Sequence, residues 1–130
     1  MTNEHREIYR DDIERASKAL DHMGFTARVI NDNNGFIPLH YDDEDEGIEF
    51  ILSKIALIHS EVSEMTEELR RKEDNMDERF TEEIVDVIVR LLDLYTGMNA
   101  RGFTLPDLAD IYYKKMLKNS KRGYKHGKKA

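Results

Sequence analysis

Two pairs of acidic residues stand out because of their spacing. Glu61 and Glu64 are three residues apart, and so are Glu83 and Asp86. On a helix, residues three apart share one face, with Cβ atoms about 5–6 Å apart. If the two helices that carry these pairs pack antiparallel, the four carboxylates can face one another. Four hard oxygen ligands suit Mg²⁺ or Mn²⁺, ions that also bind substrate phosphates.

The spacing alone leaves other interpretations open. Acid pairs at this distance are common on solvated helices, and four acids are interpreted in that way: Glu67, Glu68, Glu73 and Asp74. Arg90 follows Asp86 by four residues, so the two could pair without any metal. A di-iron bundle is disfavoured because such proteins use Glu-x-x-His repeats, and neither His59 nor His126 stands three residues after a Glu.

Helices are needed to position these acids, and the apolar spacing predicts four of them. They cover residues 4–22, 46–72, 78–99 and 105–120. Gly24 is predicted to stop the first helix, and Asp77 and Thr104 to cap the third and fourth. Residues 24–45 are rich in Asn, Gly and acids, which predicts a loop with a short extended piece at 27–30.

The third helix carries a polar stripe on an otherwise apolar surface. Its centre reads IVDVIVRLLDLY, which predicts deep burial. Glu83, Asp86, Arg90 and Asp93 lie on one stripe of this helix. The short connection at 73–77 favours antiparallel packing against the second helix. The sequence therefore predicts an all-α helical bundle in one domain, residues 1–130.

Composition and charge exclude several classes of protein. The 130 residues include no Cys, which excludes disulfides, thiolate zinc sites and cysteine nucleophiles. The lack of an apolar membrane-spanning run and of a signal-like N-terminus favours a soluble, cytoplasmic protein. Residues 111–130 contain eight basic residues and no acid, whereas residues 1–110 contain 12 basic and 27 acidic residues. This division suggests a ligand that contacts both signs of charge.

The acids and their surroundings resemble the MazG-like all-α nucleoside triphosphate pyrophosphohydrolases. The resemblance lies in KIALIHSEVSEMTEELR at 54–70, EEIVDVIVRLLDLY at 82–95 and KNSKRGYKHGKKA at 118–130. It extends over residues 54–130. Residues 1–50, the N-terminal helix and loop, diverge from the family, and residues 121–130 form a basic tail.

The resemblance implies an enzyme that converts a (d)NTP and water to a (d)NMP and pyrophosphate, as in nucleotide pool control or house-cleaning. It implies a helical bundle completed by dimerisation, as a homodimer or tetramer. Its catalytic carboxylates, which hold Mg²⁺, correspond by position to Glu61, Glu64, Glu83 and Asp86.

Positive charge for the leaving pyrophosphate is expected from the basic segment. The substrate-phosphate residues are predicted to be Lys115, Asn119, Arg122 and Lys125, whereas Lys128 and Lys129 are interpreted as solvated. Relatives build the base pocket partly from N-terminal aromatics. The corresponding candidates here are His40, Tyr41 and Phe50.

Two positions depart from the family pattern. Ser60 stands where many relatives have a second Glu that helps to activate water, so Glu64, Glu82 or the metal alone must do this. Gly123 replaces a Pro, which leaves the tail less rigid. The alternative function is a non-catalytic helical module that binds nucleic acid or an acidic partner through its basic segment. Nucleic acid is disfavoured because the acidic body repels it.

Overall fold

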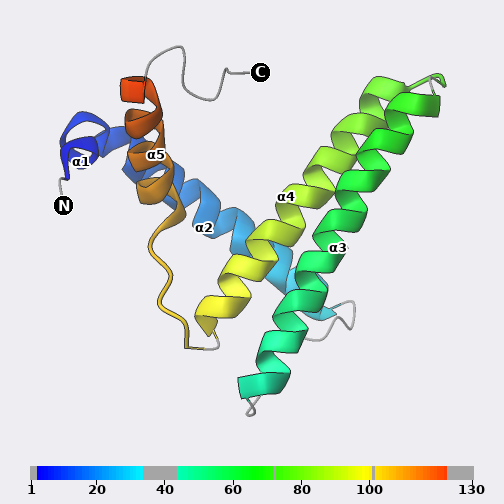
Figure 1. Ribbon diagram of the computed structural model, residues 1–130, viewed down its shortest axis with the longest axis horizontal. Helices are drawn as coiled ribbons and strands as arrows, with labels where there is room; N and C mark the ends of the chain where they lie inside the picture. The colour runs from blue at the N-terminus through cyan, green and yellow to red at the C-terminus, as the bar shows by residue number, and fades with distance from the viewer. Residues whose placement is uncertain (1–2, 34–43, 72, 101, 123–130) are drawn as a thin grey trace. The chain divides into compact units, whose positions relative to one another are not determined.

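A computed structural model describes residues 3–33, 44–71, 73–100 and 102–122 (Figure 1). The helices are α1 (Glu4–Ile8), α2 (Arg10–Asn33), α3 (Glu44–Arg71), α4 (Met76–Ala100) and α5 (Leu108–Arg122). The described residues form no strand, so the predicted all-α class is confirmed. None of the described helices combines the length and apolar character needed to cross a membrane.

The chain divides into two compact units, and each is described by itself. One contains residues 1–22 and 106–130, and the other contains residues 23–105. The first unit therefore holds α1, the first half of α2, and α5. The second holds the rest of α2 together with α3 and α4.

In the first unit, α1 is held against α5 by polar side chains. Arg6 donates two hydrogen bonds to Asp110, and Nε2 of His5 lies 2.9 Å from the same carboxylate. The Arg6 guanidinium, assisted by His5, lowers the pKa of Asp110 to about 2. Lys121 near the end of α5 bonds to Glu4 at 2.6 Å. These contacts explain why the short helix α1 has a fixed place.

In the second unit, α3 and α4 lie side by side and antiparallel (Figure 1). The turn between them contains Asn75, whose φ of 64° is in the left-handed region that Asn tolerates better than most residues. Both helices agree with the predicted ranges to within a few residues. The predicted antiparallel packing of the two acid-bearing helices is thus confirmed.

The predicted stop at Gly24 is wrong, because α2 continues through it to Asn33. The predicted extended piece at 27–30 is also helical, with Ala27 buried. Gly24 instead permits a close approach to α4: a Cβ atom at this position would lie 2.9 Å from Cγ2 of Thr96. The N-terminal break falls earlier, at Tyr9, between α1 and α2.

Both predicted helix caps are also displaced. α4 begins at Met76, so Asp77 lies within its first turn. α5 begins at Leu108 rather than at 105, after Pro106. Its cap is Asp107, whose Oδ2 accepts the amide hydrogen of Asp110 at 3.2 Å.

The predicted deep burial of the centre of α4 is wrong for most of that stretch. Leu92 is 4% exposed, but Ile84, Ile88 and Leu91 are between 36% and 48% exposed. The acid-bearing side of α4 faces α3, and these three residues lie on another side of the helix. Among the described residues, this side of α4 is therefore an exposed apolar surface.

Candidate functional site

Three ion pairs connect α3 to α4 among the described residues, and the two outer ones set the register of the helices. Nζ of Lys54 lies 2.7 Å from Oδ2 of Asp93, and both side chains are largely buried. Farther along, Nε of Arg79 lies 3.0 Å from Oε2 of Glu68. Because the helices are antiparallel, the residues between Lys54 and Glu68 on α3 face those between Arg79 and Asp93 on α4. All four predicted metal ligands fall in this interval.

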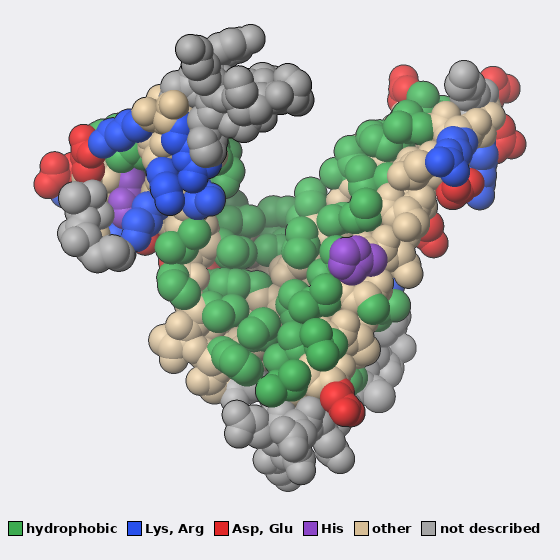
Figure 2. Space-filling model, viewed as in Figure 1, with side chains coloured by type: hydrophobic (Ala, Val, Ile, Leu, Met, Phe, Trp, Pro, Cys, Tyr) green, Lys and Arg blue, Asp and Glu red, His purple; other side chains and the backbone are tan. Residues whose placement is uncertain are grey.

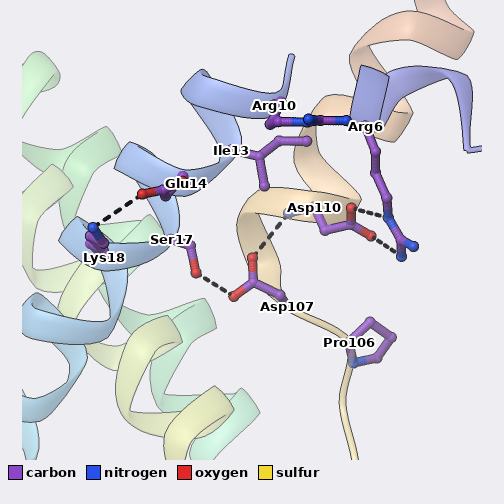
Figure 3. A pocket seen from close by; sticks show the side chains of 9 residues that line it. All are labelled: Arg6, Arg10, Ile13, Glu14, Ser17, Lys18, Pro106, Asp107 and Asp110. Carbon is purple, nitrogen blue, oxygen red and sulfur yellow. Dashed lines mark hydrogen bonds and ion pairs between the residues drawn. The ribbon is translucent and has the colours of Figure 1, made fainter. Parts of the chain in front are cut away.

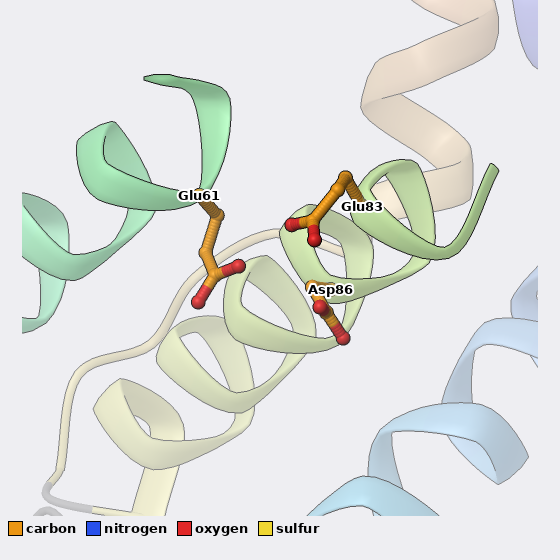
Figure 4. Close-up of side chains that lie close together, drawn as sticks. All are labelled: Glu61, Glu83 and Asp86. Carbon is orange, nitrogen blue, oxygen red and sulfur yellow. The ribbon is translucent and has the colours of Figure 1, made fainter. Parts of the chain in front are cut away.

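Three of those ligands are brought together. Glu61 projects from α3 toward Glu83 and Asp86 on α4 (Figure 4). One carboxylate oxygen from each lies within 4.8 Å of the others, a grouping that could hold a metal ion. The fourth, Glu64, is hydrogen-bonded to Glu83. We call these four residues the carboxylate cluster.

Two oxygens of the carboxylate cluster are buried without a partner. Oε2 of Glu61 and Oε2 of Glu83 are both inaccessible to solvent and accept no hydrogen bond from any residue that the structure describes. A buried carboxylate oxygen without a partner is costly, so it is expected to be satisfied by a cation or a proton. The donor set is all oxygen, which fits a hard divalent ion.

The protonation of Glu83 reflects the same crowding. Its pKa is raised to about 7, first by burial, then by the hydrogen bond with Glu64 and by the charges of Glu64, Asp86 and Glu61. Glu83 therefore holds a proton for part of the time at neutral pH when no cation is present. A bound divalent ion would favour its ionised form.

Arg90 contacts the carboxylate cluster from α4. Its Nε donates to Oε1 of Glu61 at 2.9 Å, and the Glu61 side chain is only 13% exposed. The alternative pairing of Arg90 with Asp86 is therefore replaced by a contact across the two helices. Spacing along one helix suggested only the local partner.

Asp86 also borders an open hollow of about 560 Å³ on the side of α4. Besides Asp86 and Val85, the residues that line it are Asp77, Glu78, Thr81 and Glu82. This wall is strongly acidic, so an anionic ligand would enter only with cations. The two residues considered for activating water are therefore placed differently: Glu82 lines the hollow, whereas Glu64 lies beside Glu83.

Glu68 is not the solvated acid that the sequence suggested. It is 5% exposed, and its two carboxylate oxygens pair with Nη1 of Arg71 at 2.9 Å and with Nε of Arg79 at 3.0 Å. Arg79 comes from the neighbouring helix, so the pairing could be found only from the antiparallel register. The same register would have revealed Lys54 and Asp93.

Three of the four predicted phosphate residues, Lys115, Asn119 and Arg122, are described and lie in the first unit. Lys115 and Asn119 are exposed on successive turns of α5, and Arg122 ends that helix. Lys125 lies outside the described residues. Of the base-pocket candidates, Phe50 is half-buried on α3 with Nζ of Lys54 at 5.3 Å from its ring centroid. His40 and Tyr41 lie outside the described residues.

A second hollow, of about 740 Å³, lies in the first unit (Figure 3). Most of the polar side chains that line it pair with one another: Ser17 donates to Asp107 at 2.8 Å, and Lys18 pairs with Glu14 at 3.2 Å. Asp110 is likewise engaged by Arg6. The hollow is therefore better explained as the polar junction of α1, α2 and α5 than as a ligand site.

The comparisons with known proteins identify no family for this chain. No family model, curated protein or solved structure matches it.

Proposed function

We propose that this protein is a metal-dependent nucleoside triphosphate pyrophosphohydrolase of the MazG-like kind. It would convert a (d)NTP and water to a (d)NMP and pyrophosphate in the cytoplasmic nucleotide pool. The observation that carries this proposal is the convergence of Glu61, Glu83 and Asp86 within 4.8 Å. The partnerless buried oxygens of Glu61 and Glu83 support it.

Glu61, Glu64, Glu83 and Asp86 would hold Mg²⁺ or Mn²⁺. When bound, such an ion neutralises phosphate charge and lowers the pKa of a bound water molecule. The flanking ion pairs, Lys54 with Asp93 and Glu68 with Arg79, would keep the two helices in register.

Glu64 is the better of the two candidates to accept the proton of the attacking water. The Glu64 side chain is exposed to solvent, and it forms a hydrogen bond with Glu83. Glu82 instead lines the outer hollow of α4. Ser60 cannot act as this base because its hydroxyl is not basic at neutral pH.

The basic residues of α5 would bind the leaving pyrophosphate. Lys115 and Asn119 are four residues apart, so they present an ammonium and an amide on one side of the helix. Arg122 and Lys125 would extend this set. Positive charge at the leaving group stabilises the charge that develops in the transition state.

A homodimer or tetramer would cover the exposed apolar residues. On α3 these include Ile48, Leu52, Ile55, Val62 and Leu69 at helical spacing, each at least 36% exposed. On α4 they include Ile84, Ile88 and Leu91. Hydrophobic side chains gather over both helices on the face seen in Figure 2. Large apolar patches of this kind mark interaction surfaces.

The experiment that tests this function is a panel of ribo- and deoxyribonucleoside triphosphates, with and without Mg²⁺, in which released pyrophosphate is measured. We expect metal-dependent release from at least one nucleotide and its loss in Glu61→Gln. Glu67→Gln is the matched control because Glu67 is 57% exposed and pairs with Arg70, one turn along the same helix. No release from any nucleotide would refute the proposal and favour the non-catalytic binding module.

A further inference from the structure

Arg90 has a different environment from the other cations between α3 and α4. Lys54 pairs with Asp93, and Arg79 pairs with Glu68 and, at 3.9 Å, with Glu73; these carboxylates lie outside the cluster. Arg90 instead bonds to Glu61, which belongs to a group of converging acids. Its positive charge therefore lies beside one member of the carboxylate cluster.

Arg90 engages only one of the two carboxylate oxygens of Glu61. Nε of Arg90 donates to Oε1 at 2.9 Å, whereas Oε2 is buried and accepts no hydrogen bond within the described part of the chain. The Arg90 side chain is 34% exposed, so it has a route toward solvent if its charge is no longer favoured beside the acids. Arg90 is therefore placed to respond to any cation that enters the carboxylate cluster.

We propose that Arg90 is the built-in counter-cation of the carboxylate cluster, neutralising Glu61 when no divalent ion is present and competing with that ion for the cluster. This inference rests on the metal site of the proposed function. The reason is electrostatic: a guanidinium beside Glu61 lowers the negative potential that attracts a cation, and two cations at one carboxylate repel each other.

The proposal predicts opposite effects on stability and on affinity. Without Arg90, the negative charge of the carboxylate cluster would be less neutralised in the metal-free protein, which would therefore be less stable. The same loss would leave the carboxylate cluster more attractive to Mg²⁺. A residue that only braced the two helices would instead weaken both forms of the protein equally and leave the affinity unchanged.

The test uses the full chain and Mg²⁺ alone, with no nucleotide. Mg²⁺ affinity is measured by calorimetry, and thermal unfolding is followed in EDTA and in saturating Mg²⁺. The variants are Arg90→Gln, Arg90→Lys and the matched control Lys54→Gln, which breaks an ion pair between the same helices outside the carboxylate cluster.

We expect Arg90→Gln to bind Mg²⁺ on the order of tenfold more tightly than the wild type. Its unfolding temperature should fall in EDTA and be largely restored by Mg²⁺. Arg90→Lys keeps the charge and should stay near the wild-type affinity. Lys54→Gln should lower the unfolding temperature equally with and without Mg²⁺. An unchanged or weaker affinity in Arg90→Gln would overturn the proposal.

A second measurement covers the case in which Arg90→Gln does not fold. In the wild type, the Nε–H proton of Arg90 should exchange slowly in EDTA because it is bonded to Glu61, and faster as Mg²⁺ is added. Its NMR signal is identified by its absence in Arg90→Lys. Exchange that is insensitive to bound Mg²⁺ would overturn the inference. A wild type that binds no divalent ion would overturn both this inference and the metal site, whereas Mg²⁺ binding without pyrophosphate release would overturn the proposed function alone.

Discussion

Glu64 on α3 and Glu83 on α4 form a hydrogen bond when a proton is present on one of the two carboxyl groups. Burial, this hydrogen bond and the neighbouring charges raise the pKa of Glu83 to about 7 from an ordinary value of 4.5. Because the folded protein binds this proton more tightly than the unfolded chain does, the metal-free fold gains stability at low pH. That contribution is lost as the pH rises through about 7.

The first prediction concerns this pH dependence. In EDTA, the wild type should lose more stability between pH 5 and pH 8 than Glu83→Gln, whose amide does not titrate. Urea unfolding at the two pH values measures the difference. Saturating Mg²⁺ should reverse the trend for the wild type, because metal binding requires ionised carboxylates. Equal pH dependence in the wild type and Glu83→Gln would contradict the assignment of the shared proton.

The second prediction separates the two candidate bases. Glu64→Gln should reduce kcat by about a hundredfold or more in saturating Mg²⁺, which is the usual contribution of a positioned general base. Glu82→Gln should stay within a few-fold of the wild type, since Glu82 lines the outer hollow. Steady-state kinetics at several Mg²⁺ concentrations distinguishes a lost base from a lost ligand. The reverse order of the two effects would assign the base to Glu82.

Spacing along the chain was sufficient to predict the acid-bearing helices and the convergence of Glu61, Glu83 and Asp86. It was insufficient where the partner comes from another element. Glu68 and Glu67 are adjacent and identical in type, yet only Glu68 meets Arg79 of α4. A pattern within one helix contains no information about that contact.

The same limit applies to Gly24. A glycine after an apolar run usually ends a helix, and only the approach of Thr96 shows why it lies within one here. The caps were misplaced for a related reason. Thr104 and Asp107 both suit an N-cap, and the choice depends on where α5 can begin after Pro106.

The third prediction tests the contact between Gly24 and Thr96. Gly24→Ala should destabilise the protein by about 1–3 kcal/mol through overpacking, although Ala favours helices. Thr96→Ser removes Cγ2 while keeping the hydroxyl that bonds to the carbonyl of Leu92. In the Thr96→Ser background, Gly24→Ala should therefore become neutral or stabilising by up to about 1 kcal/mol. Additive effects in this double-mutant cycle would refute the close packing.

The last prediction concerns the apolar surface of α4. Ile88 is 39% exposed, so Ile88→Glu would cost little in a chain that remained monomeric. In a dimer that buries this surface, the same change places a charge in an apolar interface and should dissociate it. Sedimentation velocity should show a dimer or tetramer for the wild type and a monomer for Ile88→Glu. Leu57→Glu is the matched control, since Leu57 is 45% exposed on α3 but lies outside the apolar row from Ile48 to Leu69. A wild-type monomer, or equal dissociation by both variants, would contradict the assignment of this surface to self-association.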